Sequence, residues 1–419
     1  MSDKEREDLF YVCSLIEHVG RKTKNRRGDI KECNVMRTVR SGRLAWSLVL
    51  AGVVCAGCAA AAEDVAKFDP AMAAKKSVVT NGVKWIDGKF LPVEGKPFAA
   101  SETETFFERL PKAAYGNDGV KGMKCHTTGI QLRFVTDSTK VSVRWKNDGS
   151  AFPHMTAIGR SGIDIYRLCA KTGKWRYVTS GWPNAKGASC ATAQWNPGEA
   201  CLVNLPLYNG VEFVEVGIDA KATISAPPPH RSGVEKPVVF YGTSITHGGC
   251  CTRPGLSFVN IIGRELDVPV VNEGYSGSGR MEMEMCEWIA KIDASCYVLD
   301  CLWNMSDDLV AKRFEPFVRA LREKRPETPI LVAESCDVYH LHGEKTRFEK
   351  KHEIVRGVYA KLKAEDPAKW AKLYYIDSDS QMSDDGEGTV DGCHPNDLGM
   401  RDMARGFGAK LREILGLKN

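Results

Sequence analysis

The chain has 419 residues, of which 43% are hydrophobic and 26% charged. This composition is globular, neither fibrous nor disordered, and the length allows two ordinary domains plus a leader. The formal net charge is +5, but residues 1–62 hold 11 Lys/Arg against 7 Asp/Glu, so the rest of the chain is almost neutral. Because a protein that binds nucleic-acid phosphates concentrates basic charge in its folded part, the charge distribution argues against nucleic-acid binding.

The chain begins with a predicted leader over residues 1–62. No charged residue occurs in residues 44–62, three arginines precede this stretch, and small residues end it. A basic segment, an apolar core and a small-residue end are typical of a bacterial signal peptide. An uncleaved transmembrane anchor is the alternative, because the stretch is long enough to cross a bilayer. We therefore expect a secreted, periplasmic or envelope-attached protein.

The true start of the chain is open. Met36 is followed by a signal peptide of ordinary layout, so residues 1–35 are interpreted as a dispensable extension or a gene-start artefact. Cys55-Ala-Gly-Cys58 weakly resembles a lipoprotein box, in which Cys58 would carry the lipid. We expect contact with a membrane only through an uncleaved leader or a lipid anchor at Cys58.

Residues 63–76 are rich in Ala and Lys and are interpreted as a tether, and short strands are predicted over 77–225. Apolar residues alternate with polar ones over 130–134 and 141–145, and the turn between them predicts a hairpin. A second hairpin is predicted from strands beginning at Ile163 and at Trp175, and a further strand over 211–218. Many short strands separated by turns indicate a β-sandwich.

Ala226-Pro-Pro-Pro229 breaks this pattern and predicts a semi-rigid linker over residues 226–235. Beyond it, from residue 236 to residue 419, short apolar runs alternate with amphipathic segments, which predicts a doubly wound α/β domain with a parallel sheet. The predicted strands are 237–241, 268–271, 297–299 and 329–333, and the predicted helices are 258–266, 281–292, 309–324, 348–363 and 398–415.

Polar residues with catalytic potential follow the predicted strands of this second domain. Ser244 comes directly after the first strand, and Asp391 and His394 share one loop before the last helix. A serine nucleophile needs a base, and the base needs a carboxylate that orients it. Gly277 and Asn304 follow the next two strands and carry the donor types of an oxyanion hole. Each residue alone is as well explained by a turn or a helix cap.

Taken together, these residues resemble the SGNH (GDSL-type) hydrolase superfamily over roughly residues 236–419. Its four sequence blocks are similar to those around Ser244, Gly277, Asn304 and His394, with Asp391 before the histidine. The resemblance implies a flavodoxin-like doubly wound sheet. Gly162-Ile-Asp-Ile-Tyr166 is similar to the Gly-x-Asp-Leu-Tyr hallmark of a subgroup with an N-terminal β-sandwich, which we expect to be jelly-roll-like.

The chain also departs from the pattern of the superfamily. Thr243 stands where the GDSL name has Asp, and Trp303 and Met305 replace the Gly and Asp that commonly flank the block-three Asn. None of these changes removes a catalytic group. They change the expected shape of the loops and of the acyl pocket, and hence the expected substrate, more than the chemistry.

The resemblance implies acyl transfer in two steps. His394 takes the proton of Ser244, which attacks an ester carbonyl, and Asp391 orients the imidazole. The N–H groups of Ser244 and Gly277 and the Asn304 amide stabilise the oxyanion, and water then hydrolyses the acyl-enzyme. No metal or organic cofactor is expected. Cys336, His340 and His342 do not indicate a metal site, because no fourth ligand occurs at a useful spacing.

Several neighbouring residues are interpreted as structural. We expect His247 to continue the Ser244 loop, Arg253 to order the rim of the site rather than bind an anion, and the adjacent Cys250 and Cys251 to contribute to packing. Asp164 and Tyr166 are expected to define the fold of the sandwich.

The sequence thus predicts an exported serine esterase that acts on small-molecule or glycan esters, with O-acetyl groups of carbohydrates preferred. A lipid or lysophospholipid esterase is the alternative among enzymes. A glycan-binding surface protein with an inactive hydrolase domain is the alternative among binding proteins, although retention of all five catalytic-type residues argues against it. Since fold alone does not define a substrate, the carbohydrate prediction rests on analogy.

Overall fold

The computed structural model describes residues 70–336, 348–383 and 385–418. The predicted leader, including Cys58, lies outside the described residues, as do His340 and His342. Part of the predicted tether is helical, because Pro70–Lys75 form helix α2. No helix in the described part of the chain has the length and apolar character needed to cross a membrane.

Two antiparallel sheets form the N-terminal sandwich, as predicted. Their strand orders are β1-β2-β10-β5-β8 and β11-β4-β9-β6-β7, with β3 added beside β4. The strands are β1 (Ser77–Thr80), β2 (Val83–Asp87), β3 (Val93–Glu94), β4 (Gln131–Thr136), β5 (Lys140–Lys146), β6 (Ile163–Cys169), β7 (Lys174–Gly181), β8 (Ser189–Gln194), β9 (Ala200–Asn204), β10 (Phe213–Asp219) and β11 (Ile224–Ser225). Short helical segments connect them: η1 (Gly88–Phe90), α3 (Asp118–Met123) and α4 (Ala157–Ser161).

One of the two predicted hairpins is wrong. Strands β4 and β5 are consecutive in the chain, but β4 pairs with β9 and β5 pairs with β8 and β10, so they belong to different sheets. Residues 137–139 therefore carry the chain across the sandwich. The alternating side chains of both strands, such as Phe134 and Trp145, face the same core between the sheets. The second prediction is confirmed, since β6 and β7 pair antiparallel.

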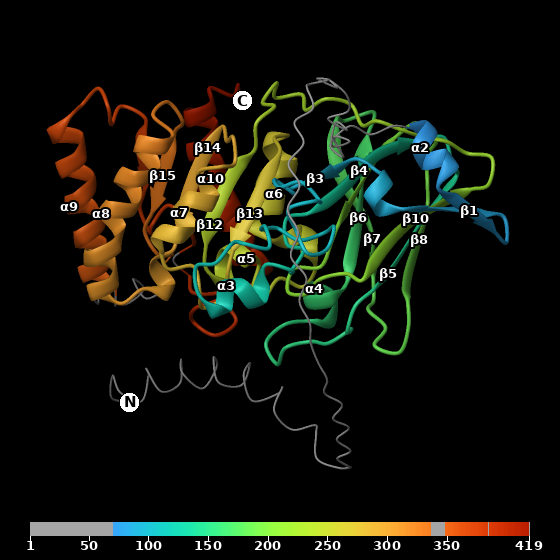
Figure 1. Ribbon diagram of the computed structural model, residues 1–419, viewed down its shortest axis with the longest axis horizontal. Coiled ribbons are helices and arrows are strands. Elements are labelled where there is room, and N and C mark those ends of the chain that lie inside the picture. The colour runs from blue at the N-terminus through green and yellow to red at the C-terminus, as the bar shows by residue number, and fades with distance from the viewer. Residues whose placement is uncertain (1–69, 337–347, 384, 419) are drawn as a thin grey trace, which may run out of the picture. The chain divides into compact units, whose positions relative to one another are not determined.

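The second part of the chain contains a five-stranded parallel sheet, which confirms the doubly wound prediction. Its strand order is β13-β12-β14-β15-β16 (Figure 1), which is the flavodoxin-like order 2-1-3-4-5. The strands are β12 (Val238–Gly242), β13 (Val270–Gly274), β14 (Cys296–Asp300), β15 (Ile330–Ala333) and β16 (Leu373–Ile376), the last of which the sequence did not predict.

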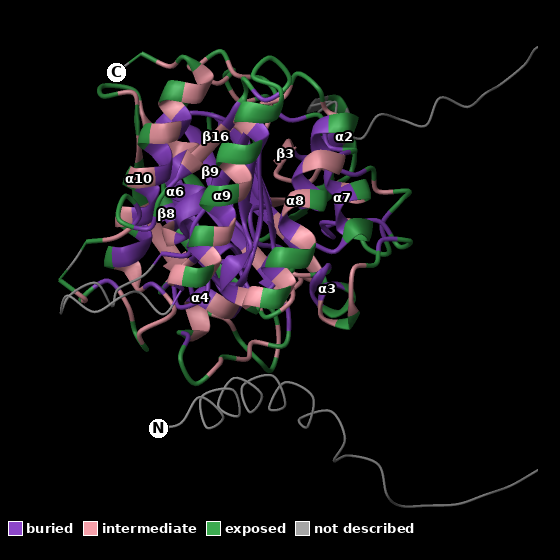
Figure 2. Cartoon of the chain, turned by 90° about the vertical axis from the view of Figure 1, so that its left-hand side faces the viewer, coloured by how far each residue is buried: buried purple, intermediate pink, exposed green. Residues whose placement is uncertain are grey.

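Helices cover both faces of this sheet. They are α5 (Ser244–His247), α6 (Phe258–Leu266), α7 (Met283–Ile289), α8 (Asp307–Lys324), α9 (Glu349–Glu365) and α10 (Asp397–Leu415), with 3-10 turns η2 (Pro254–Leu256) and η3 (Leu302–Asn304). Alternate residues of β12 enter different cores: Val239 and Tyr241 pack with α7, α8 and α9, while Val238 and Phe240 pack with α6 and α10. Figure 2 shows the resulting buried layer along the sheet, with the exposed residues on the outer faces of the helices.

The Gly-x-Asp-Leu-Tyr-like segment was expected to define the fold of the sandwich. In the structure it also joins the sandwich to the hydrolase part. The Asp164 carboxylate is fully buried and accepts hydrogen bonds from the Arg253 guanidinium and the Gly255 N–H, both at 2.8 Å. Arg253 also donates to the Tyr166 hydroxyl. A Cβ on Gly255 would lie 2.6 Å from the Tyr166 ring, so this close approach requires glycine. These contacts are consistent with the structural role predicted for Arg253, and its ordering of the rim of the site stays a prediction.

We expect Asp164→Ala to lower the free energy of unfolding by roughly 3 kcal/mol, because it leaves the largely buried Arg253 guanidinium without its carboxylate. The matched control is Glu212→Ala, which removes an exposed ion pair with Lys146 and should cost less than about 1 kcal/mol. Urea unfolding followed by circular dichroism measures both. Equal losses in the two variants would contradict the buried junction.

Candidate active site

The turn that carries Ser244 leaves the sheet at its topological switch point. Strand β12 has β13 on one side and β14 on the other, and ligands of doubly wound folds bind at the carboxyl ends of such strands. Strand β12 ends at Gly242, where a Cβ would lie 2.0 Å from Thr246 Oγ1 and 2.6 Å from the Asp300 carbonyl oxygen. The chain can therefore turn sharply only with glycine here, and Ser244 follows as the first residue of α5.

The structure brings together the three residues predicted to form the catalytic set. Ser244 Oγ lies 2.9 Å from His394 Nε2, and His394 Nδ1 lies 2.8 Å from Asp391 Oδ2. The other carboxylate oxygen of Asp391 accepts the backbone N–H groups of Cys393 and His394. Gly392, with a φ of 75°, allows the tight turn in which these bonds form. The backbone thus fixes the carboxylate, and the carboxylate fixes the imidazole with Nε2 toward Ser244.

The electrostatics of this loop stabilise the protonated form of His394. Burial alone would lower the His394 pKa, but the hydrogen bond to Asp391, a contact with Cys393 and the negative charge of Asp391 outweigh it and raise the pKa to about 10. For Asp391, burial alone would raise the pKa, whereas the hydrogen bond and charge of His394 lower it to about 2. An imidazolium at this position is therefore strongly favoured. The intermediate that forms once Ser244 has given its proton to His394 needs such an imidazolium.

The predicted oxyanion residues are tied to the Ser244 turn through Tyr275. The Tyr275 N–H donates to the Gly242 carbonyl oxygen at 2.9 Å, and the Asn304 side-chain amide donates to the Tyr275 carbonyl oxygen at 3.3 Å. Gly277, two residues after Tyr275, has a φ of 65°, a left-handed conformation that glycine adopts readily. The loops that carry the block-one, block-two and block-three residues are thus hydrogen-bonded to one another.

His247, which we expected to continue the Ser244 loop, is the last residue of helix α5, and its side chain packs. Its ring is buried and stacks on Tyr208, with centroids 4.0 Å apart. Nε2 lies 2.9 Å from the Leu207 carbonyl oxygen, and Nδ1 accepts the Ser276 N–H at 3.4 Å. Burial, together with the nearby Arg109 charge, lowers the His247 pKa well below its usual range. A neutral imidazole therefore joins the Ser244 helix to the loop that carries Gly277.

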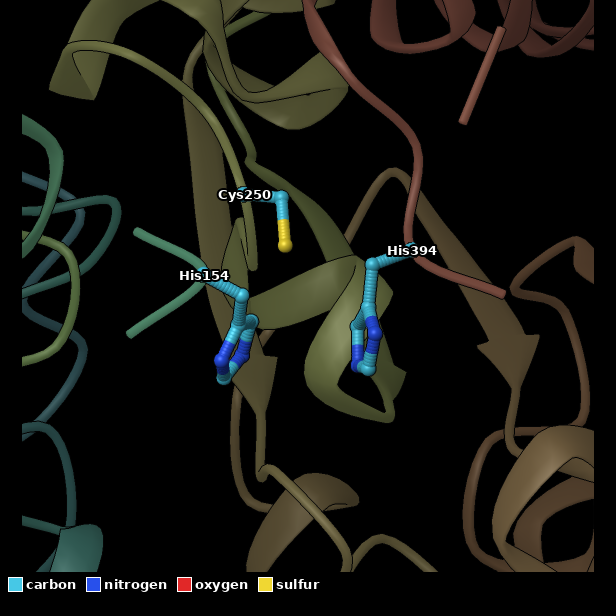
Figure 3. Close-up of side chains that lie close together, drawn as sticks. All are labelled: His154, Cys250 and His394. Atoms are coloured by element: carbon cyan, nitrogen blue, oxygen red, sulfur yellow. The ribbon is translucent and has the colours of Figure 1, made fainter. Parts of the chain in front are cut away.

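Residues outside the predicted catalytic motifs also lie at the site, and no local sequence pattern indicates their position there. The Tyr208 hydroxyl donates to the Ser244 carbonyl oxygen at 3.0 Å. His154, in the loop between β5 and α4, lies with its ring centroid 5.5 Å from that of His394. Cys250 is buried in the core on this side of the sheet, in agreement with its expected packing role, and its sulfur lies near both His154 and His394 (Figure 3). None of these residues falls in a recognisable motif, because contacts between distant segments leave no local pattern.

Two family models match the chain. Residues 235–412 match the GDSL-like lipase/acylhydrolase family, and residues 83–224 match the GxDLY model, described as the N-terminus of Esterase_SGNH_hydro-type proteins. The chain belongs to the SGNH (GDSL-type) hydrolase superfamily. It is a carboxylic ester hydrolase, in agreement with the family of its catalytic part. The matched segments do not test the predicted domain boundaries, which stay predictions.

Several solved structures resemble this SGNH hydrolase. A protein described as a GDSL-like lipase, from Bacteroides ovatus, is 28% identical, with coverage of 80% of this chain and 99% of that chain and a TM-score of 0.69. The salicylyl-acyltransferase SsfX3 from a tetracycline biosynthetic pathway is 17% identical, with 81% and 100% covered and a TM-score of 0.61. A family two carbohydrate esterase from Clostridium thermocellum, in complex with cellohexaose, is 16% identical, with 77% and 99% covered and a TM-score of 0.52. The last two show the shared fold alone. No curated protein matches the chain.

We expect the His394 imidazole of this SGNH hydrolase to titrate far above the 6.5 of a free histidine, and Asp391→Asn to bring its pKa down sharply. The substitution removes the negative charge that opposes the effect of burial, so the imidazolium loses its stabilisation. Imidazole ¹⁵N shifts followed against pH by NMR measure the change. Asp385→Asn, at an exposed position of the same loop, is the control and should leave the titration in place. An unshifted His394 in Asp391→Asn would contradict the assignment.

Proposed function

We propose that the protein is an exported serine esterase that removes small acyl groups, acetyl above all, from carbohydrates. Ser244 is the nucleophile, His394 the general base and acid, and Asp391 the residue that orients His394. The observation that carries the proposal is the continuous hydrogen-bond chain from Ser244 Oγ through both nitrogens of His394 to Asp391. A nucleophile, a base and an orienting carboxylate in this order form the arrangement that serine hydrolases share.

The chemistry proceeds through an acyl-enzyme. His394 acts in its deprotonated form, which a pKa of about 10 makes the minor form at neutral pH. It accepts the Ser244 proton as Oγ attacks the ester carbonyl carbon, and the imidazolium returns that proton to the departing alcohol. Water then attacks the acyl group by the same route and regenerates Ser244. The N–H groups of Ser244 and Gly277 and the Asn304 amide stabilise the oxyanion in both steps. Loss of one such donor typically costs on the order of 10²–10³ in turnover.

We base the preference for a small acyl group on the bulk of the residue next to Asn304, whose side chain is buried in the core. Trp303 occupies a position that is commonly glycine in block three, and its indole packs edge-on against Phe348 with ring centroids 4.5 Å apart. A bulky ring here leaves less space beside the proposed oxyanion hole for a long acyl chain than glycine would. Acetyl is the smallest common acyl group and best fits a restricted pocket.

The carbohydrate part of the proposal is supported by two observations. The sandwich places the exposed imidazole of His154 beside His394, the residue proposed to return a proton to the departing alcohol. Two polar ring nitrogens at that position suit a hydroxyl-rich alcohol better than a lipid tail. The similar fold of a family two carbohydrate esterase crystallised with cellohexaose agrees with this choice, although at 16% identity the likeness extends only to the fold.

We expect the full chain to release p-nitrophenol from the acetyl ester faster than from the butyryl and octanoyl esters, and acetate from acetylated glycans. Ser244→Ala should abolish both activities, because no other hydroxyl is hydrogen-bonded to His394 among the described residues. Ser383→Ala, at an exposed serine bonded to Asp402, is the control and should keep full activity. A preference for octanoyl esters would favour the lipid esterase, and activity that survives Ser244→Ala would contradict the mechanism.

Export is supported by the uncharged segment over residues 44–62 and the arginines before it. We expect the protein in the periplasm, the envelope or the medium after expression in a bacterial host, and a chain that starts at Asp64 in the cytoplasm. Cell fractionation with an antibody to the protein measures this. Recovery of the full-length chain in the cytoplasm would contradict export.

A further inference from the structure

Three side chains with metal-binding atoms face one another beside Ser244. They are His154 from the sandwich, Cys250 from the segment after α5, and His394 from the loop before α10 (Figure 3). A ring nitrogen of each histidine and the Cys250 Sγ all lie within 4.8 Å of one another. The fold thus gathers one sulfur and two nitrogen donors from three distant segments of the chain.

Two of these groups have no hydrogen-bond partner among the described residues. His154 is exposed, and no described residue is hydrogen-bonded to its imidazole. Cys250 is a buried free thiol whose Sγ makes no hydrogen bond within the described part of the chain. The Cys250 backbone has a φ of 69°, a conformation uncommon for residues other than glycine. The Cys250 sulfur points toward the space between the two rings (Figure 3).

His394 is already arranged as metal-binding histidines are. Its Nδ1 is hydrogen-bonded to the Asp391 carboxylate at 2.8 Å, which leaves Nε2 as the ring nitrogen that faces outward. A carboxylate behind the imidazole is the usual arrangement around a metal-bound histidine. Ser244 Oγ is the present partner of Nε2 at 2.9 Å. A cation and the Ser244 hydroxyl would therefore compete for the same nitrogen.

We propose that His154, Cys250 and His394 form an inhibitory site for a thiophilic divalent cation, of which Zn²⁺ is the best fit. Two imidazoles and one thiolate, with a water molecule in fourth place, form a normal tetrahedral zinc set. Donor atoms of such a site lie roughly 3.5 Å apart. The three donor atoms here lie within 4.8 Å of one another, and the exposed His154 ring can adjust its position on binding. On binding, Cys250 and the His394 imidazolium each release a proton to solvent as the sulfur–metal and nitrogen–metal bonds form, and no electron is transferred.

A second set, Asp391, Cys393 and His394, also lies within 4.8 Å. It is the weaker candidate, because the Asp391 carboxylate is already occupied by His394 and by two backbone N–H groups. A cation there would have to break the bonds that hold the loop in shape. The set with His154 and Cys250 breaks only the Ser244–His394 hydrogen bond.

Co²⁺ added to the full chain tests the site directly, since a thiolate bound to Co²⁺ gives a charge-transfer band in the near ultraviolet. We expect this band in the parent protein and in Ser244→Ala, and its loss in Cys250→Ser. His154→Ala should weaken Co²⁺ binding by about 10-fold or more, as expected for loss of a ligand. Cys393→Ser should keep the band. Absence of the band from the parent protein, or its persistence in Cys250→Ser with loss in Cys393→Ser, would overturn the site.

A kinetic experiment tests whether the bound cation blocks ester hydrolysis. This consequence rests on the proposed role of His394 in that reaction. We expect Zn²⁺ to inhibit p-nitrophenyl acetate hydrolysis, with at least about 10-fold more Zn²⁺ needed for half-inhibition of His154→Ala. The Co²⁺ band can be observed without turnover, so the experiments distinguish a failure of the metal site from a failure of the proposed esterase function. A band without inhibition would overturn the inhibitory role, and turnover without a band would overturn the site while leaving the esterase in place.

Discussion

One hydrogen bond of 2.9 Å, between residues 150 positions apart in the chain, links the two halves of the proposed catalytic machinery. Ser244 Oγ belongs to the first strand-to-helix turn of the parallel sheet, and His394 Nε2 to the last loop before the final helix. Helix α10 packs against α6 on one face of the sheet, and this packing brings the last loop beside the first turn. The geometry of the site is therefore set by the cores on both sides of β12 as much as by the reacting side chains.

The sandwich is coupled to this machinery through buried polar contacts. Arg109 is fully buried and donates to the carbonyl oxygens of Asn272 and Gly274 at the end of β13, both at 2.9 Å. The same guanidinium donates to the Met123 and His126 carbonyl oxygens on its own side. Since β13 leads into the loop of Tyr275 and Gly277, Arg109 supports the proposed oxyanion loop from outside the sheet. Tyr208 supports the Ser244 turn in the same way.

The sequence was sufficient for the parts of the fold that have a local pattern. Continuous apolar runs predicted four of the five parallel strands, and the order of polar residues after them located the Ser244, Gly277, Asn304 and His394 loops. Strand β16 was missed, because it has only four residues, of which Leu373 and Ile376 are buried and the two tyrosines between them are only partly buried. The β4–β5 hairpin was wrong for a similar reason: alternation shows that two strands share a core but does not show whether they share a sheet.

The contacts between the sandwich and the catalytic part were beyond prediction from local pattern. Asp164 was expected to act within its own domain, yet two of its partners, Arg253 and Gly255, lie about 90 residues downstream. His154 and Cys250 belong to no motif, and only the folded chain places them near His394. Side chains that act across a junction contact a surface built from segments that are distant in the sequence, so no short stretch of sequence predicts these contacts.

The buried Arg109 has a consequence for recombination of such domains. Its four carbonyl partners are split evenly between the two parts of the chain, so neither part alone offers this guanidinium a complete set of acceptors. The junction is thus a poor crossover point. A foreign sandwich grafted onto this catalytic sheet would have to bring its own arginine to the end of β13, or leave two backbone carbonyl groups beneath the active site without their donor.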